Sequence, residues 1–354
     1  MVKYGLYAML LFVPITLFAE FLVDGFDPVL LFIFAALAII PLAKFIGEAT
    51  EELAVHTGPK VGGLLNATLG NAAELIITIF ALRQGLNELV LASITGSILG
   101  NLLLVLGLSL LVGGLKNGIQ TFDRRTAGMN ATLMILAVAA LMIPSLFDVA
   151  IEDNQAAEVG LSEGVAIILI VLYGLSILYS FTQGKISSGH DDEGESHHAK
   201  WSVKFSGIIL AIATIGIVFM SEALVGAVEH VTEELGLTEF FIGIIVIPLV
   251  GNVAEHLVAV QVAYKDKMEL SLAVSLGSSL QIALFVAPVL VFISLFFDET
   301  LLLVFTDFEL IALAATVGVA SFVAQDGESN WFEGSMLLAV YMILGLAFYY
   351  LPAG

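Results

Sequence analysis

Runs of apolar residues, each long enough to cross a membrane, recur along almost the whole sequence. A helix needs about 20 such residues to span the hydrocarbon core of a bilayer. Only 13% of the residues are charged, whereas about a quarter is typical of soluble domains. The sequence therefore predicts an all-α polytopic membrane protein in a lipid bilayer, with about 11 transmembrane helices. The predicted spans are residues 4–21, 28–56, 60–82, 88–115, 127–148, 160–183, 203–229, 237–264, 268–296, 306–325 and 330–351.

The first span has a second interpretation, as a signal peptide. It carries a single basic residue, Lys3, shows no clear small-x-small cleavage site, and has a hydrophobic stretch at the long end for such a peptide. We therefore expect residues 1–24 to form a retained N-terminal transmembrane helix.

The basic residues predict the orientation, because Lys and Arg concentrate in cytoplasmic connections. If the spans alternate in direction, Arg83 lies on one side and Lys44 lies within a span. The other ten of the 12 basic residues lie on the side of the N-terminus: Lys3, Lys60, Lys116, Arg124, Arg125, Lys185, Lys200, Lys204, Lys265 and Lys267. We expect a cytoplasmic N-terminus, an external C-terminus and, since no organelle-targeting extension is apparent, the cell membrane as the location.

One short motif occurs twice within these apolar runs. Gly-Asn-Ala-Ala-Glu at 70–74 is repeated as Gly-Asn-Val-Ala-Glu at 251–255. A second segment, Gly-Ser-Ile-Leu at 96–99, returns as Gly-Ser-Ser-Leu at 277–280. Both pairs are separated by the same 181 residues, so the chain contains an internal duplication.

The duplication divides the spans that follow the first helix into two sets of five. The first five-helix repeat is expected at 25–184 and the second at 201–354. Because five is odd, the second repeat must cross the membrane in the opposite direction. Inverted repeats with a polar motif near the middle of each are typical of secondary transporters, whose sites form where the repeats meet.

A polar segment at 185–200 separates the two repeats on the predicted cytoplasmic side. Its carboxylates and imidazoles are compatible with a cation sensor, but it lacks the ligand spacing of an EF-hand loop, so a solvated linker is the simpler interpretation. These residues are His190, Asp191, Asp192, Glu193, Glu195, His197 and His198.

Glu74 and Glu255 are the main candidate site residues. A charged side chain at the centre of a bilayer costs about 2.5–3.5 kcal/mol on insertion scales, which usually marks a functional group. Asn71 and Asn252 precede them by three residues and so share a helix face with them. The alternative is that these polar groups only hold helices together.

Oxygen donors predict the kind of ion. Carboxylate, amide and hydroxyl oxygens suit a hard cation such as Ca²⁺, and the chain has no Cys to bind a soft metal. Ser97 and Asn101, and likewise Ser278 and Gln281, can face the neighbouring motif as further ligands or as packing residues. No cofactor is expected, with Ca²⁺ as the transported substrate. The net charge of −21 disfavours nucleic acid and suits a cation.

The paired carboxylates also suggest a mechanism. Burial and mutual repulsion favour the protonated form of an empty carboxyl pair. One site could then hold either Ca²⁺ or protons, and this competition is the basis of exchange. Two carboxylates would trade two protons for one Ca²⁺, with no net movement of charge. A third proton would make transport electrogenic, and the membrane potential would then contribute about 2.3 kcal/mol per charge per 100 mV.

Three further residues are candidates for proton or ion access. His256 could relay protons or be an ordinary buried histidine. Glu51 lies near the inner end of its span and Glu222 near the outer end of its own. One carboxylate would then lie in each vestibule or at each membrane interface. Pro248 precedes the second motif and could free backbone carbonyls or simply kink the helix.

The motifs resemble those of the cation/proton exchanger family, the Ca²⁺/H⁺ antiporters of the cation/Ca²⁺ exchanger superfamily. The resemblance covers almost the whole chain. It implies eleven helices in inverted repeats, Ca²⁺ extrusion driven by proton uptake, and Glu74 and Glu255 as the central carboxylates. The matching segments are 62–68, 70–74, 96–101, 251–256, 277–282 and 326–334.

Other functions are compatible with parts of the pattern. A Na⁺/Ca²⁺ exchanger would share the repeats, but its motifs have Ser or Thr and a Pro before the acid, unlike Asn-Ala-Ala-Glu. A passive cation channel is a different class of protein. An intramembrane metalloenzyme would need a second His one turn from His256, which the sequence lacks. A homo-oligomer is compatible with all of these functions.

Overall fold

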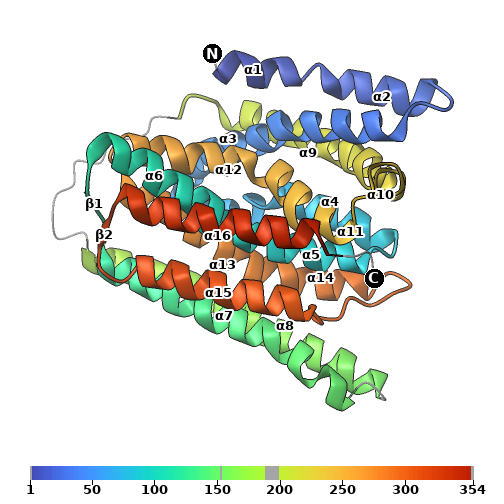
Figure 1. The fold of residues 1–354 in the computed structure, drawn as a ribbon. Helices are drawn as coiled ribbons and strands as arrows, with labels where there is room; N and C mark the ends of the chain where they lie inside the picture. The colour runs from blue at the N-terminus through green and yellow to red at the C-terminus, as the bar shows by residue number, and fades with distance from the viewer. Residues whose placement is uncertain (1, 152–153, 188–198, 352–354) are drawn as a thin grey trace.

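The computed structural model describes residues 2–151, 154–187 and 199–351. Within these ranges the chain folds into one helical bundle (Figure 1). The first half contains α1 (Val2–Met9), α2 (Phe12–Leu22), α3 (Pro28–Leu69), α4 (Ala72–Arg83), α5 (Asn87–Leu99), the π-helical turn η1 (Gly100–Val105), α6 (Leu106–Asn117), β1 (Gln120–Thr121), α7 (Arg124–Ile151) and α8 (Gln155–Ser187). The second half contains α9 (Val203–Gly226), α10 (Val228–Leu235), α11 (Glu239–Phe241), η2 (Ile242–Val246), α12 (Ile247–Tyr264), α13 (Met268–Gln281), η3 (Ile282–Val286), α14 (Ala287–Ser294), α15 (Asp307–Val323), β2 (Glu328–Ser329) and α16 (Trp331–Tyr349).

The protein is an all-α multi-pass membrane protein, as predicted. Across the described ranges, nine helical stretches are long and apolar enough to cross a membrane. The other two predicted spans are shaped differently. Span 60–82 is interrupted near its middle, and 306–325 contains α15, a helix of 17 residues. The count of eleven crossings therefore stays a prediction.

The N-terminal span is interrupted rather than continuous. α1 ends at Met9 and α2 begins at Phe12, because Pro14 has no N–H to donate to the carbonyl of Leu10 and its ring crowds that carbonyl. Both short helices pack on α3, through the ring pairs Tyr7–Phe45 and Phe12–Phe34.

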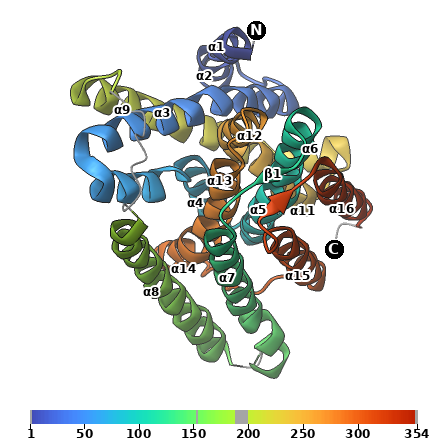
Figure 2. The ribbon, with the colours of Figure 1, turned by 90° about the vertical axis from the view of Figure 1, so that its left-hand side faces the viewer.

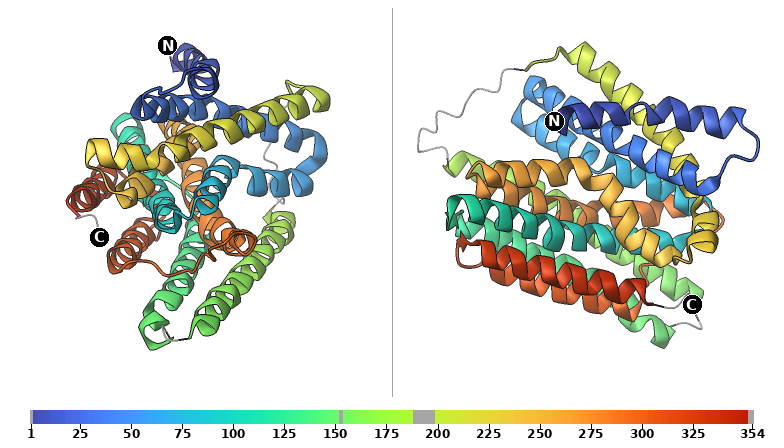
Figure 3. Two further views of the ribbon diagram at one scale, coloured as in Figure 1. Left: turned by 90° about the vertical axis from the view of Figure 1, so that its right-hand side faces the viewer. Right: turned by 45° about the horizontal axis from the view of Figure 1, so that its top comes forward.

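The helices of the two halves interleave around a common centre. α3 packs along α9, and α12 packs against α3, α6 and α13. In Figure 1 the α3–α9 pair lies between the N-terminal helices and the rest of the bundle. Figure 2 and the left view of Figure 3 show α7 and α8 as a pair that projects away from α3 and α9. The centre of the bundle is thus built from α4–α6 and α11–α14.

The duplication is visible in the backbone as two matching π-helical turns. In η1 the N–H of Leu106 donates to the carbonyl of Asn101, and in η3 the N–H of Ala287 donates to that of Ile282. Both positions differ by the 181 residues that separate the motifs. Such turns within helices often occur at functional sites.

A two-stranded sheet that the sequence did not predict closes one end of the bundle. β1 pairs antiparallel with β2, with Gln120 opposite Ser329. Gln120 Nε2 also donates to the carbonyl of Ala263 at 3.0 Å and to Asp266 Oδ1 at 2.8 Å. The α6–α7 and α15–α16 connections are therefore fastened to the turn between α12 and α13.

The linker predicted at 185–200 lies partly outside the described residues, which exclude 188–198 and with them its acidic and histidine residues. Its end is tied to α3: Glu52 Oε2 accepts hydrogen bonds from the backbone N–H groups of Lys200 and Trp201, at 2.7 and 3.1 Å. The start of the second half is thereby attached to α3, six residues before its turn at Gly58.

Glycines allow α16 to lie directly on α6. A Cβ added at Gly334 would stand 2.6 Å from the carbonyl oxygen of Gly107 and 2.9 Å from the carbonyl carbon of Leu110. Small residues at such contacts let helix backbones approach closely within a membrane.

We expect Gly334→Ala to lower the free energy of unfolding by about 1–3 kcal/mol, the usual cost of overpacking. The matched control is Gly345→Ala on the same helix, where the nearest atom to an added Cβ is Ile245 Cδ1 at 4.0 Å. The measurement is thermal unfolding of both variants in one detergent. Equal melting temperatures for the two variants would contradict the packing described.

Candidate functional site

The first repeated motif lies at a break in a membrane helix. The helix that follows the turn at Gly58 ends at Leu69, and α4 begins at Ala72. Asn71, between them, has a non-helical backbone (φ −98°, ψ 23°). Because this stretch has no Pro, the sequence predicted a continuous span, and that prediction was wrong. Gly and Asn are both weak helix formers, and helices interrupted near the substrate site are typical of secondary transporters.

The second motif lies in a continuous helix with a distortion just before it. In η2 the N–H of Ile247 donates to the carbonyl of Ile242, five residues back. Pro248 follows, and it has no N–H for the carbonyl of Ile244. Of the two outcomes considered for Pro248, the structure shows a π-helical turn that displaces these carbonyls, after which α12 runs unbroken through Asn252 and Glu255.

Each motif glutamate packs against the glycine of the other motif. A Cβ added at Gly251 would stand 3.2 Å from Glu74 Cδ, and one added at Gly70 would stand 3.6 Å from Glu255 Oε1. The two glycines thus leave room for the carboxyl groups of the opposite motif.

The neighbouring polar residues connect the two repeats. Asn71 Nδ2 donates to Gln281 Oε1, and Ser278 Oγ donates to Asn71 Oδ1 at 3.4 Å. At the equivalent place Asn252 Nδ2 donates to Ser97 Oγ at 3.3 Å. Each Ser therefore contacts the motif of the opposite repeat.

Asn101 completes this network, since its Nδ2 donates to Ser278 Oγ at 3.1 Å. The structure thus brings together all the oxygen donors that the sequence singled out beside the two carboxylates. Apart from Gln281 and Glu255, which are partly exposed, they are buried.

The carboxylates have oxygen atoms that lack partners. Among the described residues, Glu74 Oε1 and Glu255 Oε2 are buried and accept no hydrogen bond. A buried acceptor without a partner costs free energy. Carboxylate, amide and hydroxyl oxygens around two such atoms are what a hard cation or protons would satisfy. No cluster of three or more His, Cys, Asp or Glu poised for a metal occurs in the described part of the chain, so amide and hydroxyl oxygens would have to complete a coordination shell.

A cavity of about 520 Å³ leads from Glu255 towards the end of the bundle that carries most of the Lys and Arg residues. It is lined by Gly70, Gly251, Gly277, Ser278 and Gln281, and further out by Glu51. Its outer wall includes Val262 and Leu270, which flank the turn with Lys265 and Lys267. Glu51 therefore lines the open cavity, and its role in ion or proton access stays a prediction.

The opposite side of the site is closed by close helix packing. A Cβ added at Gly96 would overlap the carbonyl oxygen of Ile244 and stand 2.6 Å from its carbon. Gly277 is the equivalent of Gly96, yet no packed neighbour among the described residues lies within 4 Å of its Cβ position. The site is thus sealed on one side and open on the other.

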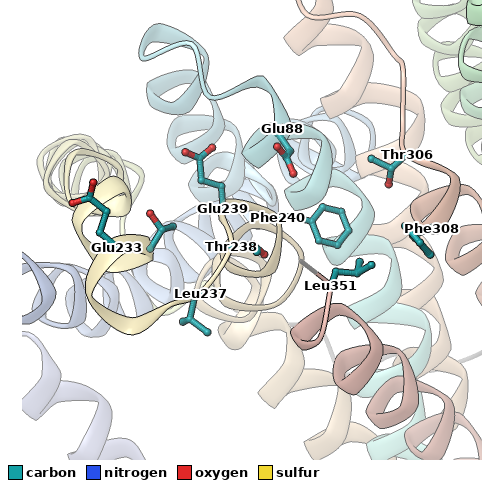
Figure 4. Close-up of a pocket in the computed structure, with 10 residues that line it drawn as sticks. Glu88, Glu233, Leu237, Thr238, Glu239, Phe240, Thr306, Phe308 and Leu351 are labelled. Carbon is teal, nitrogen blue, oxygen red and sulfur yellow. The ribbon is translucent and has the colours of Figure 1, made fainter. Parts of the chain in front are cut away.

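Beyond the sealed side lies a second cavity of about 710 Å³. Figure 4 shows the carboxylates of Glu88, Glu233 and Glu239 around it, with the apolar side chains of Phe240 and Phe308. The tight contact between α5 and η2 separates this acidic cavity from the central oxygens.

The other access residues have different surroundings. His256 is 8% exposed, and its Nε2 has no hydrogen-bond partner within the described chain. Glu222 is exposed on α9 and lines neither cavity. The proton-relay role of His256 and the vestibule role of Glu222 both stay predictions.

Two charged residues near the site were missed from the sequence. Lys44 lines the open cavity. Glu309 is 2% exposed and accepts a hydrogen bond from Thr95 Oγ1 at 3.0 Å, which ties α15 to α5 on the sealed side. The sequence does contain a signal for the position of Glu309, because Thr306 and Glu309 have the spacing of a capping box at the start of a helix.

The fold and the site together define a class: a membrane transporter with a polar site between two inverted halves. Residues 28–182 and 205–350 match the sodium/calcium exchanger protein family. The Ca²⁺/H⁺ antiporter of Aphanothece halophytica is 46% identical, covering 98% of this chain and 96% of its own. The Ca²⁺/H⁺ antiporter ChaA of Bacillus subtilis is 45% identical, over 91% of this chain and 92% of its own.

Solved structures agree with this relationship. Native YfkE superposes with a TM-score of 0.86 at 41% identity, over 98% of this chain and all of that chain. The H⁺/Ca²⁺ exchanger CAX, at 17% identity and a TM-score of 0.72 over 98% of this chain and 92% of that chain, shares the fold. The chain belongs to the Ca²⁺/H⁺ antiporter family, within the larger sodium/calcium exchanger family.

We expect Gly251→Ala to weaken Ca²⁺ binding about tenfold, because an added methyl group forces the Glu74 carboxyl to move and such strain costs about 1–3 kcal/mol. Gly318→Ala on α15, where no packed neighbour among the described residues lies within 4 Å, is the control. Binding of ⁴⁵Ca²⁺ to the purified variants measures the effect. Unchanged affinity for Gly251→Ala would argue against Glu74 as a ligand.

Proposed function

We propose that the protein exchanges Ca²⁺ for protons across a membrane, with both substrates bound at Glu74 and Glu255. The observation that carries this proposal is the pair of carboxylates, each with one buried oxygen that has no hydrogen-bond partner among the described residues, near amide and hydroxyl oxygens from both repeats. The names of the relatives support Ca²⁺ and protons as the substrates.

The mechanism rests on competition for the same oxygen atoms. With no cation bound, desolvation and repulsion between the two carboxylates favour their neutral forms. A Ca²⁺ ion that displaces these protons restores the balance of charge, since two carboxylates match one divalent ion. Two protons per Ca²⁺ is the simplest stoichiometry.

Alternating access follows from the same symmetry. The sealed contact at Gly96 and the open one at Gly277 are equivalent positions in inverted repeats, so exchanging their states would close the open cavity and open the other side. Gly277 has the small size that such a closed contact requires. The acidic cavity beside Glu88 and Glu239 would then receive the released Ca²⁺.

The direction of transport depends on the orientation of the chain. The open cavity faces the end that is rich in Lys and Arg, which the positive-inside rule assigns to the cytoplasm. With the proposed cytoplasmic N-terminus and external C-terminus, the described state would be open to cytosolic Ca²⁺. A cell membrane location is the simplest setting for Ca²⁺ extrusion, with the lipid bilayer as the surroundings.

Glu74→Gln and Glu255→Gln keep the shape of each side chain but remove its charge and its proton. We expect each variant to reduce Ca²⁺/H⁺ exchange to background in proteoliposomes with an imposed pH gradient. Glu269→Gln, an exposed position at the start of α13, should retain activity. Accumulation of Ca²⁺ at near-normal rate by either central variant would contradict the two-carboxylate site.

A comparison of driving ions separates the proposed exchanger from the alternatives. We expect Ca²⁺ uptake under a pH gradient and none under a Na⁺ gradient. Uptake driven only by Na⁺ would indicate a Na⁺/Ca²⁺ exchanger. A flux that neither gradient drives uphill would indicate a channel.

His256→Ala should alter the pH dependence of exchange while Ca²⁺ binding is largely retained, because the imidazole follows Glu255 directly but points about 100° around the helix from it. The measurements are transport rate against pH and ⁴⁵Ca²⁺ binding at alkaline pH. Lost affinity at alkaline pH would instead make His256 a ligand or a packing residue.

A further inference from the structure

Among the side chains that the structure describes, a single basic one lines the open cavity. Lys44, on α3, lines the same space as Glu255 and Glu51. Its Nζ lies 3.4 Å from Oε1 of Glu48, one turn further along the helix. Lys44 is 26% exposed and Glu48 is 37% exposed, so the pair is accessible to water and ions in the cavity.

A fixed positive charge is unexpected on a path for a divalent cation, because it repels the ion that has to pass. The other charged residues that line this cavity are Glu48, Glu51 and Glu255, all acidic. Lys44 therefore lowers the negative potential that the three carboxylates create.

The fold does not require a basic residue at this place. Thr50-Glu51 on α3 resembles Ser221-Glu222 on α9, 171 residues further along the chain. At the same offset, the position in the second repeat that corresponds to Lys44 is Ile215. Ile215 is 58% exposed on the surface of α9. The partner of Lys44, Glu48, corresponds to Phe219, so the ion pair is specific to the helix that lines the open cavity.

We propose that Lys44 lowers the affinity of the open cavity for Ca²⁺, because its fixed positive charge repels the ion and weakens the negative potential of the carboxylates. This inference rests on the proposed Ca²⁺/H⁺ exchange. When Ca²⁺ enters, the ammonium group stays with Glu48. When the cavity is empty, its charge offsets part of the repulsion among the carboxylates, which keeps Ca²⁺ from being held too tightly to be exchanged.

The test is the dependence of transport on cytosolic Ca²⁺ in everted membrane vesicles, with ⁴⁵Ca²⁺ as the probe and an acid-inside pH gradient. We expect Lys44→Gln to lower the KM for Ca²⁺ about fivefold, the scale of a unit charge acting on a divalent ion through water over several ångströms. The maximal rate should be unchanged or lower. The difference in KM should shrink at high ionic strength, where such interactions are screened.

Three further variants separate this charge effect from a structural one. Lys44→Arg keeps the charge and should keep the wild-type KM. Glu48→Gln removes an attracting carboxylate and should raise it. Lys204→Gln, an exposed position at the start of α9 that does not line the cavity, should leave it unchanged.

The outcomes distinguish this inference from the proposed function. Absence of pH-driven uptake by the wild-type protein would overturn Ca²⁺/H⁺ exchange itself. Normal wild-type exchange with an unchanged or raised KM in Lys44→Gln would overturn only the role of Lys44. Equal changes in Lys44→Gln and Lys44→Arg would likewise overturn it, because the charge would then not be the cause.

Discussion

The structure depends on the cost of keeping two carboxylates inside a membrane. That cost is about 2.5–3.5 kcal/mol for each charge on insertion scales, and it is tolerable only when protons or a cation neutralise the pair. The glycines of both motifs leave space for the carboxyl groups, and oxygen donors from four helices surround them. In the proposed exchange, protons and Ca²⁺ meet this demand for neutralisation in turn.

The two repeats are alike at the central site and differ in the routes that lead to it. Equivalent residues build the central site: Asn71 pairs with Ser278 as Asn252 pairs with Ser97. The access routes are unequal, since Gly96 is packed against Ile244 while Gly277 faces a cavity. In the proposed mechanism the site stays chemically similar while its exposure changes sides, whereas Lys44 lines only the open cavity.

Much of the architecture and of the site was predictable from sequence. Apolar runs identify membrane helices because the bilayer admits little else. The repeated Gly-Asn-x-Ala-Glu singled out residues that pack together between the repeats, and their role in transport stays a prediction. The break at Gly70 and Asn71 was missed because propensity signals are weak compared with tertiary packing. The hydrogen bonds that join the two repeats depend on how distant helices pack, and so does the position of Lys44 in the cavity. The periodicity of one sequence does not encode that packing.

The central claim is that Ca²⁺ and protons compete for Glu74 and Glu255, and calorimetric titration of Ca²⁺ into the purified protein tests it most directly. Titrations in buffers of different ionisation enthalpy report how many protons leave when Ca²⁺ binds. The account predicts about two protons released per Ca²⁺ near the pH where the empty site is protonated. Calcium binding without proton release at any pH would contradict it.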